Sequence, residues 1–530
     1  TLRSSGPAFC GPLTLAVIPL KDIMTIDNFE HLDKYFFGGE AEAEQEIRND
    51  VFVEPTDLDE LLSFRTSRYK IITAPKGVGK TLFLSVLNET ILDDDQISLL
   101  ITPKDIDCEQ VFKKSTLADQ ITSAYNQILI SAAAHVGTYM TGVGVSDAVV
   151  NLQKLAVDTG ATRLDIKSRV TRFLSEITPN GKEIAAAARA LQEINKATNI
   201  LKDDLKIVLQ KNNQKLWLLL DDLELAAVAQ DGKIDYTACW ALICAAIDIA
   251  NDFQGVRCIV SVRSDIWHIM KASKRLGAER RDKIQGSSTL SFSEDEIRNI
   301  FSKRILLASR AAGGNFADIG LFFQKDKITL PGLQETQRSW EQWISKNSRD
   351  RPRDMVHLVQ ALVKQARSSK AKLIGDDQAH KVISEFSKSR IANLAEEYQQ
   401  ICPQIKSVIQ DFAIKTLFSF QEVIEALKKC PSSRSTIVYG VALTPNSNES
   451  GVTLLSVLHM ANFINPREEL GNGKYVHKEF SKNPDFVSMD NWQELEKHSW
   501  EIHPTFHSFV NQNKSAPGWV AGITGGSRGQ

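Results

Sequence analysis

The chain has 530 residues, of which 42% are hydrophobic, and its 63 Lys and Arg against 65 Asp and Glu give a formal net charge of -2. This composition is ordinary for globular protein, and the length predicts about three domains. The charge balance argues against an overall basic nucleic-acid-binding protein, although a local basic face stays open. Seven scattered cysteines without a CxxC pair argue against a disulfide framework or zinc site, and predict reduced thiols in a cytoplasmic protein.

Both ends of the chain are expected to lie outside the folded domains. We interpret residues 1–29 as an N-terminal extension, disordered or non-native. Its apolar run 12–20 (PLTLAVIPL) is interrupted by prolines and is shorter than the roughly 20 residues of a membrane span, so a truncated signal sequence is the alternative. We expect no membrane partner. Residues 511–530 are rich in Gly and Ser and predict a disordered tail.

The predicted core, residues 30–292, opens with the pattern of an α/β parallel sheet. Residues 68–73 (RYKIIT) form a β-branched run that predicts a strand. A Gly-rich loop, APKGVGKT at 74–81, follows, and then a stretch of helical character. Residues 97–102 (ISLLIT) predict a second strand. Strand, glycine loop, helix and strand in this order are typical of a P-loop domain.

A helical insertion is expected within the core at about 110–212, because this stretch is rich in Ala, Lys, Glu and Leu. We expect breaks at Gly137 to Gly144 and at Thr178 to Gly181. The sheet then continues with further predicted elements: a strand buried on both faces at 216–220 (LWLLL), a helix at 236–253, an apolar strand within 255–267 and an edge strand at 288–292.

Helical periodicity dominates after residue 293, and we divide this part into a helical lid (293–394) and a winged-helix-like domain (395–510). Ser293 with Glu296 three residues later is a capping-box signature. Pro352 is expected in the first turn of a second lid helix. Residues 378–430 are predicted to be helical. Beyond them, one helix followed by the β-like pieces KYVHKEF and SWEIHP suggests the winged helix.

The loop APKGVGKT differs from the pattern G-x-x-x-x-G-K-[ST] only in Ala74. Gly77 and Gly79 allow backbone N–H groups to surround a phosphate at the start of a helix. Lys80 is expected to reach the β- and γ-phosphates of ATP and to act in catalysis, and Thr81 to bind Mg²⁺. The predicted nucleotide-binding residues are Pro75, Lys76, Gly77, Val78, Gly79, Lys80 and Thr81. The alternative is a chance match in an ordinary β–α turn.

Acidic residues follow the predicted strand 216–220. In P-loop NTPases such a strand end holds Mg²⁺, so we assign Asp221 to the metal. Asp222 is the candidate catalytic residue that orients or deprotonates the attacking water, with Glu224 as the weaker candidate. A solvated acidic turn is the alternative for the whole group.

Several arginines could contact the phosphates. Arg263, at the end of a strand with Ser261, could sense the γ-phosphate as a catalytic residue, or it could pair with Asp265. In the basic run 271–283, Arg280 or Arg281 could be an arginine finger for a neighbouring subunit, although a solvated helix face is the default.

Two further sets of residues need an interpretation. Arg353 of the lid could contact the nucleotide, and Arg351 could pair with Asp354 in a structural role. His503 and His507 are four residues apart but lack an acidic partner at catalytic spacing, so we expect them to be structural rather than zinc ligands.

Taken together, the motifs resemble those of the bacterial P-loop ATPases of the STAND and KAP-like class over about residues 30–510. The motifs that carry this resemblance are FFGGEAEAE (36–44), APKGVGKT (74–81), LLLDDLE (218–224), SVRSDIW (261–267), LSFSEDEIRNIFSKRI (290–305), RPRDMV (351–356) and IHPTF (502–506). The resemblance implies an NTPase core, a helical lid and a winged-helix-like domain, with ATP-driven switching or assembly in phage defence or signalling. Ala74 and Glu224 depart from the family pattern and bear on the hydrolysis rate. KAP-like transmembrane insertions have no counterpart here.

Three functions follow as hypotheses. The first is an ATP-hydrolysing molecular switch that uses ATP and Mg²⁺ and acts as a homo-oligomer or with a partner protein. The second is a DNA-binding ATPase that acts through the winged helix, against which the net charge and the acidic stretch 480–497 argue. The third is a nucleotide-binding scaffold without catalysis.

Overall fold

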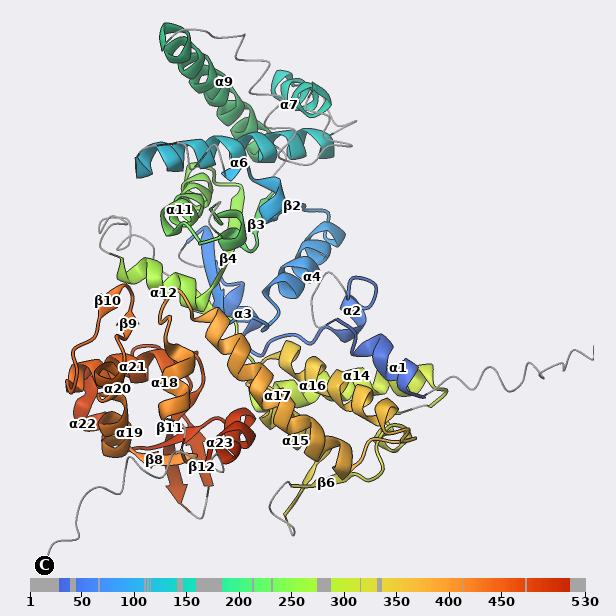
Figure 1. Cartoon of the computed structure of the whole chain (residues 1–530). Coiled ribbons are helices and arrows are strands. Elements are labelled where there is room, and N and C mark those ends of the chain that lie inside the picture. Colours follow the sequence, from blue (N-terminus) through green and yellow to red (C-terminus); the bar gives the residue numbers. More distant parts are fainter. Residues whose placement is uncertain are drawn as a thin grey trace, which may run out of the picture.

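The computed structural model shows a parallel-sheet core with a helical layer on one side, a lid and a C-terminal domain (Figure 1). It describes residues 28–38, 44–64, 67–108, 111, 114, 116–140, 146–158, 184–211, 214–229, 232–273, 287–314, 316–330, 336–412, 414–471 and 474–514. The apolar run 12–20, the expected break Thr178 to Gly181, Arg280, Arg281 and residues 515–530 lie outside these ranges.

The central sheet confirms the predicted fold class of a parallel-sheet P-loop core. Its strands run in the order β2 (Ile97–Ile101), β3 (Leu216–Leu220), β4 (Val256–Arg263), β1 (Tyr69–Ala74) and β5 (Ser287–Thr289). Every pairing in this sheet is parallel. The carboxyl ends of β1, β3 and β4 therefore meet at one edge, where ligands bind in open α/β sheets. The predicted edge strand is β5, which is shorter than expected.

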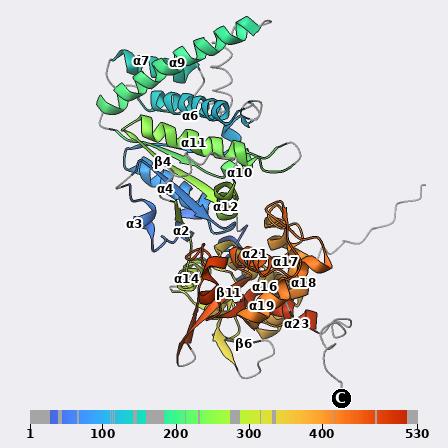
Figure 2. The same cartoon turned by 90° about the vertical axis from the view of Figure 1, so that its left-hand side faces the viewer.

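Helices cover both faces of this sheet. Figure 2 shows one face covered by α11 (Tyr236–Asp252) and α6 (Leu117–Tyr139), and the helix α4 (Lys80–Asp93) lies against the other face. In strand β3, Leu218 and Leu220 pack against α6 and α11 on one face of the sheet, whereas Leu219 packs in the core shared with the lid on the other face. Because both faces of β3 are buried, its sequence is apolar at every position. Each fully buried leucine contributes roughly 1.5–3 kcal/mol.

The helical insertion consists, in its described part, of α6, α7 (Asp147–Asp158) and α9 (Ile184–Lys211). The expected break between Gly137 and Gly144 is confirmed, because α6 ends at Tyr139 and α7 begins at Asp147, although Gly137 itself still lies in the last turn of α6. A Cβ atom on Gly137 would come within 2.0 Å of the Leu152 carbonyl oxygen, so the glycine allows α6 and α7 to pack closely. Within the described ranges, no helix combines the length and apolarity that a membrane crossing requires.

The lid contains α14 (Glu294–Ala311), α15 (Trp340–Lys346), α16 (Pro352–Ser368), α17 (Asp376–Glu397) and the hairpin β6 (Lys327–Thr329) and β7 (Gln337–Ser339). The capping box is confirmed: Ser293 accepts from the Glu296 amide, and the Glu296 carboxylate accepts from the Ser293 amide. Pro352 begins α16, as predicted. The helix α1 (Asn28–Tyr35) packs on α14, so Phe29 is buried although it falls in the expected extension.

The C-terminal domain has its own hydrophobic core. Its helices are α18 (Ile405–Phe412), α19 (Phe420–Leu427), α20 (Cys430–Ser433), α21 (Asn448–Met460), α22 (Trp492–Leu495) and α23 (His507–Lys514). Its strands are β8 (Leu417–Ser419), β9 (Ile437–Val438), β10 (Val441–Ala442), β11 (Ile464–Gly471), β12 (Lys474–His477) and β13 (Ser499–Ile502). The larger sheet has the order β12-β11-β13-β8, all antiparallel.

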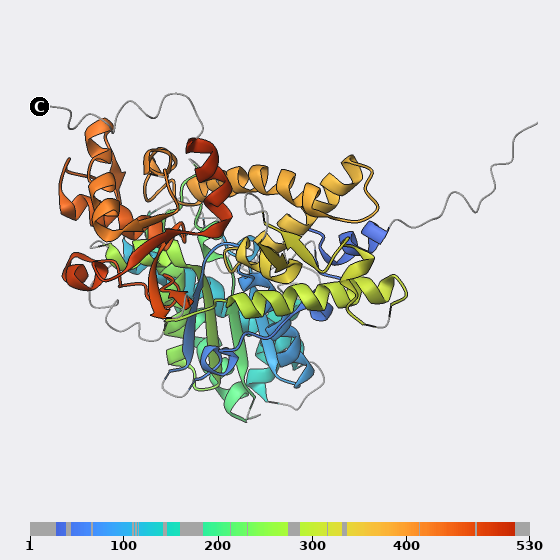
Figure 3. The same cartoon turned by 90° about the horizontal axis from the view of Figure 1, so that it is seen from below.

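Two expectations for this part of the chain are settled by the elements. The prediction of helix throughout 378–430 is wrong at β8, whose Phe418 pairs with Trp500 in the sheet. The β-like pieces KYVHKEF and SWEIHP do contain β12 and β13. Figure 3 shows the lid (yellow) and the C-terminal domain (orange to red) side by side against the core. The described cysteines are buried, and none of them forms a disulfide with another described cysteine.

Short helices complete the core. They are α2 (Arg48–Val51), α3 (Leu58–Leu61), α10 (Leu223–Ala226) and α12 (Ser264–Ala272), with a 3-10 turn at Pro103–Asp105. Further 3-10 turns lie in the lid, at Ile319–Leu321, and in the C-terminal domain, at Met489–Asn491 and Pro504–Phe506. Helix α10 directly follows β3, and α12 directly follows β4. Both helices therefore start at the edge of the sheet where the glycine loop lies, and they place polar side chains beside it.

Candidate functional site

The loop between β1 and α4 has the geometry of an anion-binding turn. Gly77 and Gly79 adopt φ of +86° and +109°, a region that favours glycine. Gly79 caps α4 without a side-chain hydrogen bond, so the first amides of this 14-residue helix are not satisfied by their own cap. The positive end of the helix and these amides favour a phosphate at this position.

Ala74, the departure from the P-loop pattern, is the last residue of β1. It is fully buried and pairs in register with Arg263 of β4. Its φ is not positive, so the backbone conformation at this position does not require glycine. The substitution therefore leaves the geometry of the loop intact.

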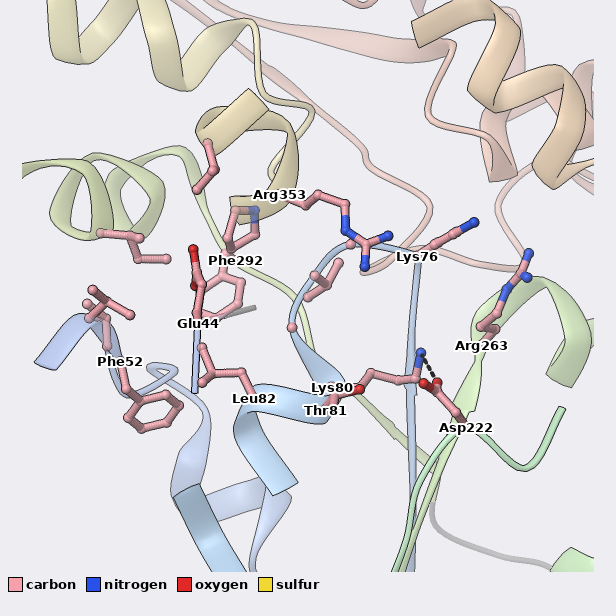
Figure 4. Close-up of a pocket in the computed structure, with 18 of the residues that line it drawn as sticks. Glu44, Phe52, Lys76, Lys80, Thr81, Leu82, Asp222, Arg263, Phe292 and Arg353 are labelled. Carbon is pink, nitrogen blue, oxygen red and sulfur yellow. Dashed lines mark ion pairs between the residues drawn. The ribbon is translucent and has the colours of Figure 1, made fainter. Parts of the chain in front are cut away.

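Lys80 extends from the start of α4 toward the acidic end of β3. Its Nζ atom lies 3.6 Å from Asp222 Oδ1 and 3.9 Å from Glu224 Oε1. Figure 4 shows the Lys80 amine beside Asp222, with Arg353 and Lys76 on the opposite side of the loop. The predicted neighbours thus meet, because β1 and β3 both flank β4 and end at the same edge of the sheet.

Asp221 is the residue directly after β3, and it is only 3% exposed. Its carboxylate accepts a hydrogen bond from the Ser261 hydroxyl of β4 and another from Thr81. Burial, and then the charge of Asp222, raise the pKa of Asp221. A carboxylate in contact with the Thr81 hydroxyl offers the hard oxygen donors that Mg²⁺ prefers, so these residues fit the ion that the sequence predicts.

Glu224, in the first turn of α10, is fully buried. Neither carboxylate oxygen has a hydrogen-bond partner among the described residues. Burial raises the pKa of Glu224 to about 7, although Lys80 acts in the opposite direction. The carboxylate of Asp222 is more accessible to solvent than that of Glu224, because 26% of the Asp222 side chain is exposed. The backbone of Asp222 adopts φ of +48°.

Of the two interpretations of Arg263, a pair with Asp265 or contact with a phosphate, the pair with Asp265 is present in the structure. The Arg263 Nη2 atom lies 2.7 Å from Asp265 Oδ2, and the Nε atom donates to Oδ1 at 3.1 Å. Burial lowers the pKa of the guanidinium, but Asp265 and Glu397 outweigh this effect and raise it. The side chain nevertheless lines the same cavity as Lys80. Contact with a γ-phosphate therefore remains a proposal.

The lid closes over the glycine loop at the start of α16. The Arg353 amide donates to the Gly77 carbonyl at 3.2 Å, and a Cβ atom on Gly77 would lie 3.1 Å from Arg353 Cβ. The expected pair of Arg351 with Asp354 is wrong, because Arg351 Nη1 binds Glu397 of α17 at 3.0 Å. Asp354 instead binds two other arginines, Arg349 and Arg390.

A cavity of about 350 Å³ lies between the core and the lid. One part is polar and is lined by Lys76, Lys80, Asp222, Arg263 and Arg353 (Figure 4). The other part is apolar. Its lining residues, which sequence reasoning missed, are Val51, Phe52, Val53, Phe292, Ile300 and Val356.

A buried ion pair closes the apolar end of this cavity. Arg304 of α14 binds Glu44 through both guanidinium nitrogens, at 2.7 and 2.8 Å. Glu44 falls in the motif FFGGEAEAE, which was quoted only for its resemblance. Its pairing with a residue 260 positions away had no local signal.

His503 and His507 both take part in local hydrogen bonds. His507 binds the Ile502 carbonyl at 2.6 Å, and His503 Nδ1 accepts from the Thr505 amide. In the described part of the chain, His, Cys, Asp and Glu form no cluster of three that could hold a metal.

Comparisons with known proteins give a broad likeness in structure. The ORC2 protein of Aeropyrum pernix in its ADPNP and ADP complexes is 11% identical over 90% of this chain and 93% of that chain, with a TM-score of 0.35. Cdc6p of Pyrobaculum aerophilum is 13% identical over 88% and 98%, at 0.32. The RuvB Holliday junction branch migration motor of Thermotoga maritima is 11% identical over 70% and 77%, at 0.26. No protein-family model and no curated protein matches the chain. The internal geometry, and not these values, carries the functional argument.

Proposed function

We propose that this chain is an ATP-binding and ATP-hydrolysing molecular switch. One observation carries the proposal: a glycine loop at the start of α4 and an acidic strand end meet in one cavity, with Lys80 Nζ 3.6 Å from Asp222. A chance glycine turn would not bring the lysine, the Thr81 hydroxyl and the acidic end of β3 together. The lid contact from Arg353 to Gly77 supports a role in reporting the state of the loop.

The residues divide the chemistry between them. The amides of Gly77 to Thr81 and the Lys80 amine bind phosphate oxygens, and Thr81 with Asp221 holds Mg²⁺. The ion, when bound, neutralises charge that develops on the transferred phosphoryl group. Asp222, whose side chain is 26% exposed, is the carboxylate that a water molecule can reach, so it orients the attacking water. Arg263 and Arg353, which line the same cavity, are the candidates for contact with the γ-phosphate.

The apolar part of the cavity accommodates the base. Phe52 and Phe292 lie in the half of the cavity away from Lys80 (Figure 4). A planar base binds well among such side chains because burial removes apolar surface from water. We take the nucleotide to be ATP.

We place the protein with the STAND and KAP-like class, with a role in defence or signalling. The order of the motifs supports this placement. In that setting, ATP between core and lid would favour one relative orientation, and hydrolysis would release it. The winged-helix interpretation of residues 395–510, a homo-oligomeric or protein-bound state and a cytoplasmic location belong to the same proposal.

The alternative, a DNA-binding ATPase, has less support from the C-terminal domain. In a winged-helix interpretation, α21 would be the helix that enters the major groove. This helix, NESGVTLLSVLHM, contains neither Lys nor Arg. Phosphate binding depends on such cations, and most of α21 is buried in the core of the C-terminal domain, so this helix offers little for a DNA groove.

Mg²⁺-dependent ATP hydrolysis by the full chain tests the proposal. We expect Lys80→Ala to abolish hydrolysis, because the phosphates lose their buried cation. Lys406→Ala is the matched control, since Lys406 lies exposed on α18 and does not line the cavity. Equal rates in the two variants would remove the site assignment.

Two further measurements separate the remaining hypotheses. Binding of labelled ATP without turnover by the unaltered chain would replace the switch with the scaffold. The mass of the particle with and without ATP tests assembly, for which we expect a larger particle when ATP is present.

A further inference from the structure

The cavity contains one buried carboxylate whose role the proposed chemistry does not use. Glu224 is fully buried, and both of its oxygens lack a hydrogen-bond partner among the described residues. A buried charge without partners is costly, so its presence calls for an explanation. The group that pairs with it is the Lys80 amine at 3.9 Å, which is itself 8% exposed.

Glu224 is poorly suited to act as the general base. Each of its oxygens exposes less than 1 Å² to solvent, so a water molecule cannot lie against them in this state. Asp222, with 26% of its side chain exposed, meets that requirement. The two carboxylates thus have different uses although both lie within 4 Å of the same amine.

We propose that Glu224 is a positioning residue: together with Asp222 it holds the Lys80 amine against the end of β3 in the ligand-free protein, and nucleotide phosphates bind in competition with this contact. The inference rests on the proposed function and adds a determinant of nucleotide affinity to it. When Glu224 is ionised, its attraction for the Lys80 amine is not screened by water, because the carboxylate is fully buried, whereas the side chain of Asp222 is partly exposed.

The surroundings of Glu224 make its charge state responsive to the ligand. The charged and titratable groups that act on it, or on which it acts, are Lys80 of α4, Asp222 at the end of β3, Arg263 of β4 and Cys239 of α11. Cys239 is neutral near pH 7, because burial raises its pKa. Arg263 is paired with Asp265. Lys80 is therefore the cation whose movement toward the phosphates removes the most compensation from Glu224.

Calorimetric titration of the full chain with ADP and Mg²⁺ tests the inference at pH 7. We expect Glu224→Gln to bind ADP about tenfold more tightly than the unaltered chain, because the amide no longer competes for Lys80. A residue with a merely structural role would weaken binding when replaced. Glu46→Gln is the matched control, since Glu46 is exposed and does not line this cavity.

The pH dependence of ADP binding by the unaltered chain is a second readout, and it does not require the variant to fold. Affinity of the unaltered chain for ADP should tighten as the pH falls through about 7, because protonated Glu224 releases the amine. In two buffers of different ionisation enthalpy, the unaltered chain should take up more protons on binding than a folded Glu224→Gln.

The outcomes are distinct. Equal or weaker ADP binding by folded Glu224→Gln, or equal proton uptake by the two proteins, would overturn the inference. So would an affinity of the unaltered chain that is flat between pH 6 and 8 (roughly one unit either side of the Glu224 pKa). Failure of the unaltered chain to bind ADP or ATP at all would instead overturn the proposed function.

Discussion

Two buried clusters of charged side chains, one in the lid and one in the cavity, differ in how closely their carboxylates are paired with cations. In the lid cluster, Arg349, Arg351 and Arg390 surround Asp354 and Glu397, and each ion pair is 3.0 Å or shorter. In the site cluster, the single amine of Lys80 faces Asp222 and Glu224 at 3.6 and 3.9 Å, with Asp221 nearby.

The difference appears in the pKa values. Burial opposes the ionisation of Asp354, but Arg349 and Arg390 outweigh it and lower its pKa to about 2. In the site cluster burial dominates and raises the pKa of Glu224 to about 7. In the lid cluster each carboxylate binds at least one arginine of its own at short range, which favours its ionised form. In the site cluster Asp222 and Glu224 share one amine, so we expect the charge state of Glu224 to depend on the position of Lys80.

The largest expected effect is on the lid cluster. Asp354→Ala should lower the free energy of unfolding of the lid by about 3–5 kcal/mol, because two buried guanidinium groups lose their counter-ion. Denaturant unfolding, followed by the fluorescence of Trp340 and Trp343 of α15, measures this. A loss below about 1 kcal/mol, the size of a surface pair, would show that the cluster is not a structural unit.

The same cluster predicts an acid dependence. The folded pKa of Asp354 is below its unfolded value, so its contribution is present above about pH 4 and is lost as the pH falls toward 2. Asp354→Ala should lack this part of the acid unfolding curve.

A smaller effect of opposite pH dependence is expected at Glu224. Its folded pKa is above the unfolded value, so the folded state loses stability as the pH rises from about 4.5 through 7. The shift corresponds to at most roughly 3 kcal/mol. The stability of Glu224→Gln relative to the unaltered chain should therefore increase between pH 5 and 8. A constant difference across this range would mean that Glu224 does not titrate there.

The smallest change in the free energy of unfolding is expected for an ion pair that is exposed to solvent. Glu385 and Lys388 form a 3.0 Å pair on the exposed side of α17, the helix that also carries Arg390 and Glu397. Glu385→Gln should change the free energy of unfolding by less than about 0.5 kcal/mol, because solvent screens the pair. Thermal melting beside Asp354→Ala tests this, and a large loss would contradict the role given to burial.

Sequence reasoning placed the parts whose signals are local. The apolar runs of β1 to β4, the glycines at 77 and 79, and the capping box of Ser293 and Glu296 each depend on residues close in the chain. Their backbone preferences and periodicity act within one element, so they are visible without the fold. The meeting of Lys80 with Asp222 also followed, because parallel strands end at one edge of a sheet.

The tertiary structure decided the rest. Arg351 binds Glu397, 46 residues away, rather than Asp354 nearby, because α17 packs on α16 and Asp354 is taken by two other arginines. The close approach of α7 to Gly137, which leaves no space for a Cβ atom, had no local signal either. The burial of Glu224 and the apolar half of the cavity depend on segments brought together from across the chain. Burial and pairing are properties of packing between elements, and no pattern within a short stretch of sequence encodes them.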